Sequence, residues 1–239
     1  MKPTIIVKTS LIPLIDTVRK LQGGEMSNII ALVWDFDKTL VDGYMQDPIF
    51  EKYDVNPKDY WKMINDLPQR YKREQDVEVN KDTIYLNQFI KDARPDGRFP
   101  GLNNAQLKEF GKELKFYRGV PDIFEAVKQV VNQDIYRERD IHVENYVVST
   151  GMSKVIQGSI VEPYMKHIWG CEFIENEDKN GQKVISELGY TIDNTSKTRA
   201  LFEINKGVPA NPDIDVNATV PEESRRVRFK NMIYIADGR

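Results

Sequence analysis

Cysteine and histidine are scarce in this sequence. Its 239 residues include one cysteine, Cys171, and two histidines, His142 and His167. A single cysteine excludes an internal disulfide bond. We expect Cys171 to be a small core residue in a reducing compartment, which predicts a cytoplasmic location. With so few of these ligands, we expect no zinc site built on histidine.

The chain also lacks a large excess of charge and a long apolar run. It carries 34 basic and 37 acidic residues, a formal net charge of −3. This balance predicts no general affinity for nucleic acid or for an acidic membrane. No uninterrupted apolar run approaches the about 20 residues that a membrane-spanning helix needs. A chain of 239 residues, 40% of them hydrophobic, fits one large domain or a core domain with a smaller inserted one.

The most informative stretch covers residues 29–40. Its first part, Ile29–Trp34, is a continuous apolar run rich in β-favouring residues, which predicts a strand buried on both faces of a parallel sheet. The run ends at Asp35 and Asp37, two carboxylates at the C-terminal end of the strand, where open α/β sheets bind their ligands. An Asp-rich surface turn is the structural alternative. Aspartate is a poor strand former, however, so the stability of the fold gives little reason for this pair.

The pattern Asp35-x-Asp37-x-Thr39 resembles the first motif of the haloacid-dehalogenase-like (HAD) phosphatases. The resemblance implies a doubly wound parallel α/β sheet, the Rossmann-like HAD core, with an inserted α-helical cap. It also implies that Asp35 is a nucleophile that forms an aspartyl-phosphate, and that Asp37 protonates the leaving oxygen and then activates water. Thr39 would lie at the phosphate site and fix the turn after the nucleophile. The dehalogenases of this superfamily lack the second aspartate, so Asp37 favours phosphoryl chemistry.

Residues 43–117 form a long polar insertion with helical periodicity and no strand-like alternation. Helix starts are predicted at Asn56-Pro57, at Asn80, and at Asn103 or Asn104. The insertion resembles the helical cap that many HAD phosphatases carry after their first motif, where it closes over the site.

The domain organisation follows from that resemblance. We expect a core made of residues 1–42 and 118–239 and a cap made of residues 43–117. Residues 1–25, with helical spacing at residues 11–21, are expected to be an accessory N-terminal segment.

A second motif is a short β-rich segment, residues 145–151, that ends in Ser149-Thr150-Gly151. A helix is predicted from Ser153 to about Ile168, so the segment also fits an ordinary helix N-cap after a strand. Its resemblance to the second HAD motif implies that Ser149 donates a hydrogen bond to a phosphoryl oxygen. Thr150 and Gly151 would lie beside it in the phosphate site.

A third parallel strand is predicted at residues 171–175, and a hairpin at residues 184–192. A helix is then expected to begin near Lys197, where HAD phosphatases carry the lysine of their third motif. The resemblance implies that Lys197 binds the phosphate and offsets the charge of the nucleophile. Lys179 and Lys183, in the preceding loop, are the alternatives for this role.

The last apolar segment, residues 231–235, predicts another buried strand, and Asp237-Gly238 after it resembles the fourth HAD motif. The resemblance implies that Mg²⁺ is bound by Asp35, by the backbone carbonyl of Asp37 and by Asp237. The family usually carries a further acidic residue shortly downstream, and this chain ends first, as if truncated just after the motif. We expect such a chain to hold Mg²⁺ weakly and to associate through the uncovered edge of its last strand.

Together the motifs predict a Mg²⁺-dependent phosphohydrolase of a small phosphorylated metabolite, a phosphoric monoester hydrolase. Two alternatives stay open: a phosphotransferase of the same superfamily, and a catalytically silent binding module. The expected partner is the phosphorylated metabolite, with no nucleic acid and no membrane. An oligomer could form through the uncovered sheet edge.

Overall fold

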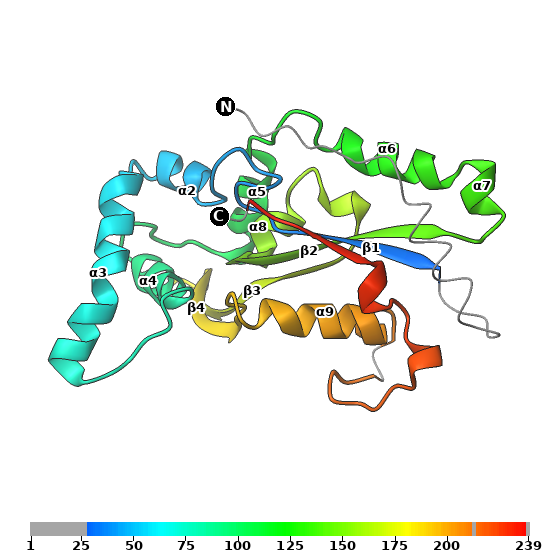
Figure 1. The fold of residues 1–239 in the computed structure, drawn as a ribbon. Coiled ribbons are helices and arrows are strands. Elements are labelled where there is room, and N and C mark those ends of the chain that lie inside the picture. Colours follow the sequence, from blue (N-terminus) through cyan, green and yellow to red (C-terminus); the bar gives the residue numbers. More distant parts are fainter. Residues whose placement is uncertain (1–27, 212–213, 238–239) are drawn as a thin grey trace.

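The computed structural model describes residues 28–211 and 214–237, and its centre is a five-stranded sheet with the strand order β4-β3-β2-β1-β5 (Figure 1). β5, β1, β2 and β3 are parallel, and β4 is antiparallel to β3. The mostly parallel sheet confirms the predicted α/β class. The strands are β1 (Ile29–Trp34), β2 (His142–Met152), β3 (Met165–Glu177), β4 (Lys183–Tyr190) and β5 (Met232–Ile235).

β1 has neighbours at both edges, since it lies between β2 and β5. Five of its six residues are buried, and Ala31 and Val33 have no solvent exposure. A strand with neighbours at both edges and helices on both faces buries every side chain, which is why its sequence is apolar throughout. The predicted buried strand is confirmed.

Helices cover both faces of the sheet, with α6 and α9 on opposite sides in Figure 1. On one face, Trp34 of β1 packs edge to face against Phe124 of α6 (Asp122–Val131), with ring centroids 5.6 Å apart. On the other face, the indole of Trp169 in β3 donates a hydrogen bond to Glu203 of α9 (Lys197–Lys206) at 2.6 Å. A short helix, α7 (Asp134–Arg137), follows α6. The predicted doubly wound arrangement is confirmed.

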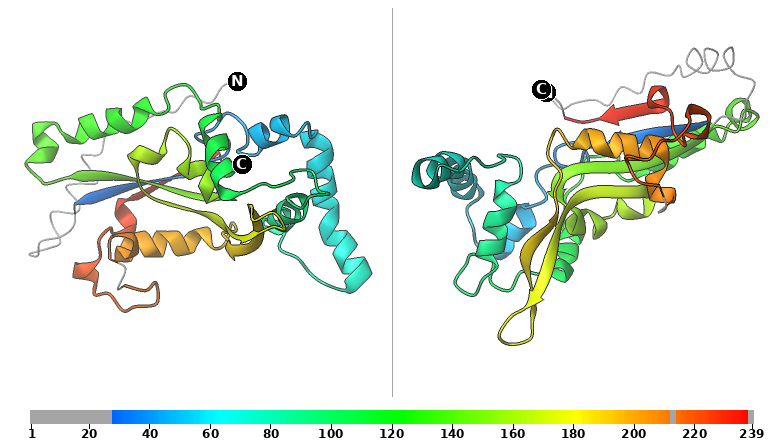
Figure 2. Two further views of the ribbon diagram at one scale, coloured as in Figure 1. Left: turned by 180° about the vertical axis from the view of Figure 1, so that it is seen from behind. Right: turned by 90° about the horizontal axis from the view of Figure 1, so that it is seen from below.

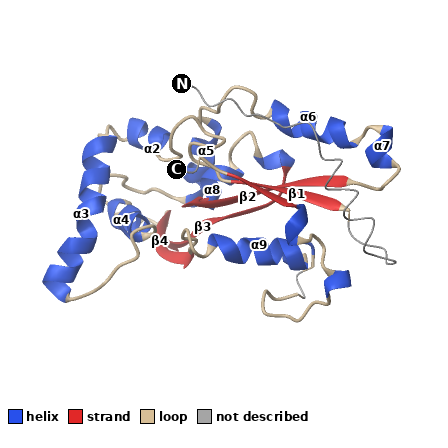
Figure 3. Cartoon of the chain, viewed as in Figure 1, coloured by secondary structure: helices blue, strands red, loops and turns tan. Residues whose placement is uncertain are grey.

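The insertion contains α2 (Asp47–Lys52), α3 (Pro57–Gln75), α4 (Ile84–Asp92) and α5 (Asn104–Lys112). α2, α3 and α4 gather beside the end of the sheet where β1 stops (Figure 3). α5 instead packs on the core helix α8 (Ser153–Gln157), where a Cβ added at Gly158 would lie 1.9 Å from the carbonyl oxygen of Lys108. A cluster of aromatic rings joins α2, α3 and α4 and includes Phe50, Tyr60, Trp61, Tyr85 and Phe89.

Side-chain caps confirm two of the three predicted helix starts. Asn56 accepts a hydrogen bond from the backbone N–H of Asp59 at 3.2 Å at the start of α3. Asn103 forms a capping box with Gln106 at the start of α5. The start at Asn80 is wrong, because α4 begins at Ile84. The Asn80 side chain accepts a hydrogen bond from the Asp82 backbone at 2.9 Å and closes a turn ahead of the helix.

The helix predicted from Ser153 to about Ile168 is also wrong. α8 ends at Gln157, a 3-10 turn follows at Glu162–Tyr164, and β3 begins at Met165. Directly after the helix, the backbone of Gly158 lies in close contact with α5. This contact joins distant parts of the chain, so local sequence patterns do not predict it. Because β2 continues to Met152, Ser149 lies inside a buried strand and not at its last residue.

The predicted C-terminal strand is present but is not buried. The hairpin predicted at residues 184–192 is wrong, because these residues contain one strand, β4, which pairs with β3. β3 and β4 form a hairpin that extends away from the rest of the sheet (Figure 2). β5 is an edge strand, in which Ile233 is 41% and Tyr234 is 44% exposed. An apolar run cannot distinguish an edge strand from a central one, so the predicted burial of residues 231–235 is wrong.

Two further expectations concern helices elsewhere in the chain. In the part of the chain that the structure describes, no helix is long and apolar enough to cross a membrane. The helix expected at residues 11–21 lies outside the described residues.

Candidate active site

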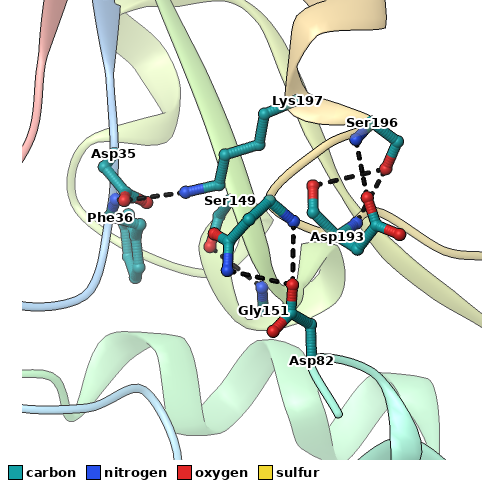
Figure 4. Close-up of polar contacts among 9 residues, drawn as sticks. Asp35, Phe36, Asp82, Ser149, Gly151, Asp193, Ser196 and Lys197 are labelled. Carbon is teal, nitrogen blue, oxygen red and sulfur yellow. Dashed lines mark hydrogen bonds and ion pairs between the residues drawn. The ribbon is translucent and has the colours of Figure 1, made fainter. Parts of the chain in front are cut away.

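Asp35 and Lys197 form an ion pair at the C-terminal end of β1 (Figure 4). The Lys197 ammonium donates to Oδ2 of Asp35 at 2.7 Å, and the backbone N–H of Phe36 donates to Oδ1 at 2.8 Å. The Asp35 and Lys197 side chains are only 19% and 13% exposed. Burial alone would lower the pKa of Lys197, but the hydrogen bond and charge of Asp35 outweigh it and raise that pKa. Lys197 therefore keeps its positive charge beside the Asp35 carboxylate.

The half-buried carboxyl of Asp37 lies two residues further on. Its Oδ1 accepts a hydrogen bond from the backbone N–H of Met45 at 2.8 Å. Burial raises the pKa of Asp37 to about 7, against the opposing effect of the Met45 N–H. The negative charges of Asp35 and Asp47 raise it further. A carboxyl with a pKa near neutrality can both give and take a proton, as general acid–base catalysis requires.

The raised pKa of Asp37 predicts a pH-dependent cost to stability. The ordinary value is 3.8. Above about pH 7 the carboxyl is ionised in both states, but the folded protein keeps the charge largely out of water while the unfolded chain exposes it to water, which costs stability. This cost decreases as the pH falls from 7 toward 3.8, because the folded state then gains its proton first. Asp37→Asn should therefore raise the melting temperature at pH 8 and leave it almost unchanged at pH 4.

Thermal unfolding in EDTA at both pH values measures this difference. Asp42→Asn is the matched control, because Asp42 is exposed and lies in the same turn. It should leave the melting temperature unchanged at both pH values. An equal shift for Asp37→Asn at pH 4 and pH 8 would contradict the buried carboxylate.

Ser149 lies in β2, the strand next to β1. Its hydroxyl oxygen accepts a hydrogen bond from the backbone N–H of Gly151 at 3.0 Å, and the residue is 2% exposed. A Cβ at Gly151 would lie 2.1 Å from the Met45 methyl carbon, so a larger residue there would require the Met45 side chain to move. The backbone carbonyl of Thr150 accepts the hydroxyl of Tyr85 at 3.0 Å. The structure thus places this second motif beside the turn that follows Asp37.

Backbone bonds hold the turn that contains Thr39. The carbonyl of Phe36 accepts the N–H groups of Thr39, Leu40 and Val41 at 3.3, 2.9 and 3.1 Å. The hydroxyl of Thr39 is buried and has no hydrogen-bond partner in the described part of the chain. Thr39 thus contributes to the turn through its backbone N–H, and its side-chain hydroxyl stays available.

Oxygen donors for a magnesium ion follow the C-terminal ends of two neighbouring strands. Asp35 follows β1 and the exposed Asp237 follows β5, and the two strands are parallel with Trp34 opposite Ile235. With the backbone carbonyl of Asp37, these donors fit the chemistry of Mg²⁺, which prefers oxygen ligands and keeps several waters. Among the described residues, however, no three His, Cys, Asp or Glu side chains gather as a metal site.

Tyr234 of β5 adjoins the ion pair, and the sequence did not indicate it. Its hydroxyl lies close to Lys197, and burial and the charge of Asp35 raise the pKa of Tyr234. A lone tyrosine in an apolar run close to Asp237 was the only signal. Both alternative lysines, Lys179 and Lys183, are exposed on the β3–β4 hairpin, whereas Lys197 contacts Asp35.

The fold and the site define an α/β protein with a carboxylate–lysine pair at the carboxyl edge of a doubly wound sheet. No model of a known protein family matches the chain. The chain is 36% identical over 224 residues to an uncharacterized protein of Borreliella burgdorferi, a match that covers 90% of this chain and 76% of that protein. The chain belongs to the same protein family as this Borreliella protein.

Solved structures similar to the chain have low sequence identity to it. A HAD family hydrolase from Salmonella enterica subsp. enterica serovar Typhi has a TM-score of 0.49 and 11% identity, over 87% of this chain and 56% of that one. A phospho-aspartyl intermediate analogue of phosphoserine phosphatase has a TM-score of 0.46 and 16% identity, over 80% of this chain and 75% of that one. The chain thus spans just over half of the Salmonella hydrolase.

Proposed function

We propose that the chain is a HAD-like phosphatase that hydrolyses a small phosphorylated metabolite through an aspartyl-phosphate, an acyl phosphate formed on Asp35. The observation that carries the proposal is the 2.7 Å ion pair of Asp35 and Lys197 at the end of the central strand. A phosphate ester is anionic and repels a carboxylate, so a carboxylate nucleophile needs a fixed cation beside it. The sequence motifs assign the same two residues to the same roles.

The proposed reaction has two steps. First, an oxygen of Asp35 bonds to phosphorus while the bond from phosphorus to the ester oxygen breaks. Asp37 gives its proton to that oxygen, and the alcohol leaves. Second, Asp37 takes a proton from a water whose oxygen bonds to phosphorus, so inorganic phosphate leaves and the Asp35 carboxylate is restored. A pKa of about 7 suits Asp37 to both transfers.

The other motif residues would bind the phosphoryl group. Ser149 already accepts a hydrogen bond from Gly151, which leaves its own proton for a phosphoryl oxygen. Thr39 would add its unpartnered hydroxyl, and Thr150 and Gly151 would line the same site. The ammonium of Lys197 would offset the charge of Asp35 and of the phosphoryl oxygens.

We also propose that the activity depends on Mg²⁺ held by Asp35, the carbonyl of Asp37 and Asp237. When bound, the ion would neutralise negative charge on the phosphoryl group. EDTA should therefore abolish turnover and added Mg²⁺ should restore it. Asp237→Asn should raise the Mg²⁺ concentration for half-maximal rate by at least about tenfold. Substituting residues that only hydrogen-bond to metal ligands already lowers metal affinity by about tenfold or more.

A rate titration with Mg²⁺ and calorimetry of Mg²⁺ binding measure this effect. Asp96→Asn, at an exposed position of the insertion, is the control and should bind as the wild type does. An unchanged Mg²⁺ requirement in Asp237→Asn would remove Asp237 from the proposed ligands.

The insertion at residues 43–117 is proposed to be a cap on a core of residues 1–42 and 118–239. The hydroxyl of Tyr85 in α4 donates to the carbonyl of Thr150 at 3.0 Å, which puts the start of α4 next to Ser149. A cap in this place would exclude bulk water from the aspartyl-phosphate and line the substrate site.

Assays with p-nitrophenyl phosphate and Mg²⁺, followed by a panel of phosphorylated metabolites, test the proposed activity. Equal amounts of alcohol and inorganic phosphate support a hydrolase. Phosphate found on an added alcohol would assign a phosphotransferase. If no ester is turned over and no phosphate is found on Asp35, the result would favour a catalytically silent binding module. A cytoplasmic location and association through the edge strand β5 stay predictions.

A further inference from the structure

Two residues of the insertion, Asp82 and Asn80, contact the turn that leads into α9, the helix that begins with Lys197. Figure 4 shows Asp82 beside this turn. Asp82 accepts hydrogen bonds from the backbone N–H and the side-chain amide of Asn194 at 3.0 and 2.9 Å. The amide of Asn80 donates to Oδ2 of Asp193 at 2.8 Å. Each asparagine thus donates to an aspartate of the opposite segment, across more than 110 residues of sequence.

A tight turn connects these contacts to Lys197. Oδ1 of Asp193 accepts the backbone N–H of Ser196 at 2.6 Å, and its carbonyl accepts the backbone N–H of Lys197 at 3.0 Å. The N–H of Asp193 in turn donates to the Ser196 hydroxyl at 2.8 Å. Because the turn is bonded in both directions, a displacement of Asp193 displaces the first residue of α9.

The same part of the insertion also reaches the other side of the site. Asp82 lies two residues before α4, and Tyr85 in the first turn of α4 donates to the carbonyl of Thr150. One segment, residues 80–85, therefore contacts both the strand next to Asp35 and the turn ahead of Lys197. A rigid connection of this kind fixes the distance between the two sides of the site.

We propose that Asp82 and Asn80 are positioning residues that align Lys197 on Asp35, so that the ion pair depends on how the insertion is seated. The proposal rests on the roles proposed above for Asp35 and Lys197. Asn80 and Asn194 are exposed, so water replaces these bonds when the segment moves away. The insertion then controls the charge beside the nucleophile as well as access to it.

The test compares two substitutions at one position. Asp82→Ala removes the acceptor for both Asn194 donors, whereas Asp82→Asn keeps an oxygen of the same shape there. With p-nitrophenyl phosphate, Asp82→Ala should lower kcat about tenfold with KM within about twofold, because a misplaced lysine weakens the transition state more than binding. Asp82→Asn should retain most of the wild-type kcat. Asp66→Ala, an exposed aspartate on α3, should have no effect.

Hydrogen exchange measures the contact without any activity. In Asp82→Ala, peptides covering residues 193–199 should exchange about fivefold faster than in the wild type, as the loss of a hydrogen bond predicts. Exchange in β1 should stay the same. Unchanged exchange at residues 193–199 would overturn the proposal even if the protein is an active phosphatase, as would equal kcat values for Asp82→Ala and the wild type. If exchange is faster in Asp82→Ala but the protein has no phosphatase activity, the contact between the insertion and the turn is supported and the proposed reaction is refuted.

Discussion

Substituting asparagine for Asp35 should abolish hydrolysis of p-nitrophenyl phosphate, with a fall in kcat of at least about 10⁴-fold. The amide has nearly the same shape but is a poor nucleophile, so no aspartyl-phosphate can form at this position. Its carbonyl oxygen can still accept a hydrogen bond from Lys197 or from the Phe36 N–H, which now hold the carboxylate. Initial rates, with circular dichroism and melting temperature as checks of the fold, measure the effect.

Asp42→Asn is the control for this experiment. It makes the same chemical change at an exposed aspartate of the same turn, and it should keep the wild-type rate. A folded Asp35→Asn protein with the wild-type rate would rule out the covalent mechanism. An equal loss in both variants would assign the effect to the turn and not to the nucleophile.

Substituting asparagine for Asp37 should separate the two steps of the reaction. The amide can neither protonate the leaving oxygen nor take a proton from water, so kcat should fall by about 10²- to 10⁴-fold. The p-nitrophenolate group leaves with little help, so Asp35 should still be phosphorylated. The aspartyl-phosphate should then accumulate, because the step that hydrolyses it is slow. Mass spectrometry after an acid quench should find phosphate on Asp35.

The double variant Asp35→Asn/Asp37→Asn is the matched control and should carry no phosphate. Phosphate on Ser149 in the single variant would overturn the assignment of the nucleophile. A wild-type rate without accumulated aspartyl-phosphate would show that Asp37 is not the acid–base residue. After either result, Tyr234 would be the next residue to test, because its hydroxyl also lies beside Lys197.

The different environments of the two aspartates explain why similar substitutions should have different outcomes. The Lys197 ammonium donates to Asp35 at 2.7 Å, so a cation lies directly beside the proposed nucleophile. Asp37 is held by a neutral N–H, from Met45, and burial raises its pKa to about 7. One carboxylate thus has a cation beside it, while the other can hold a proton near neutral pH.

Local patterns in the sequence were sufficient for much of the fold. The apolar run at residues 29–34 predicted a strand buried on both faces, because a central strand leaves no position for a polar side chain. Asn56 and Asn103 predicted the starts of α3 and α5, because a helix needs side-chain acceptors for its first N–H groups. Each of these signals acts over a few residues.

Contacts between distant residues decided the elements that the sequence did not predict. α8 ends at Gln157, next to the close contact of Gly158 with α5, and β3 begins at Met165 where a helix was predicted. Asn80 closes a turn instead of starting a helix, and its side chain bonds to Asp193. The apolar run of β5 predicted a buried strand, but its place at the edge of the sheet exposes Tyr234.

For the site, the sequence by itself identified Asp35, Asp37, Ser149 and Lys197 as candidates, through motifs that mark the ends of strands and the start of a helix. Only the tertiary structure decided that Lys197, 162 residues from Asp35, contacts it, while Lys183 does not. It also decided the raised pKa of Asp37 and the contact of Asp82 with Asn194. Burial, charge separation and hydrogen-bond distance are properties of the packed chain, because they depend on residues that the fold brings together from far apart in the sequence.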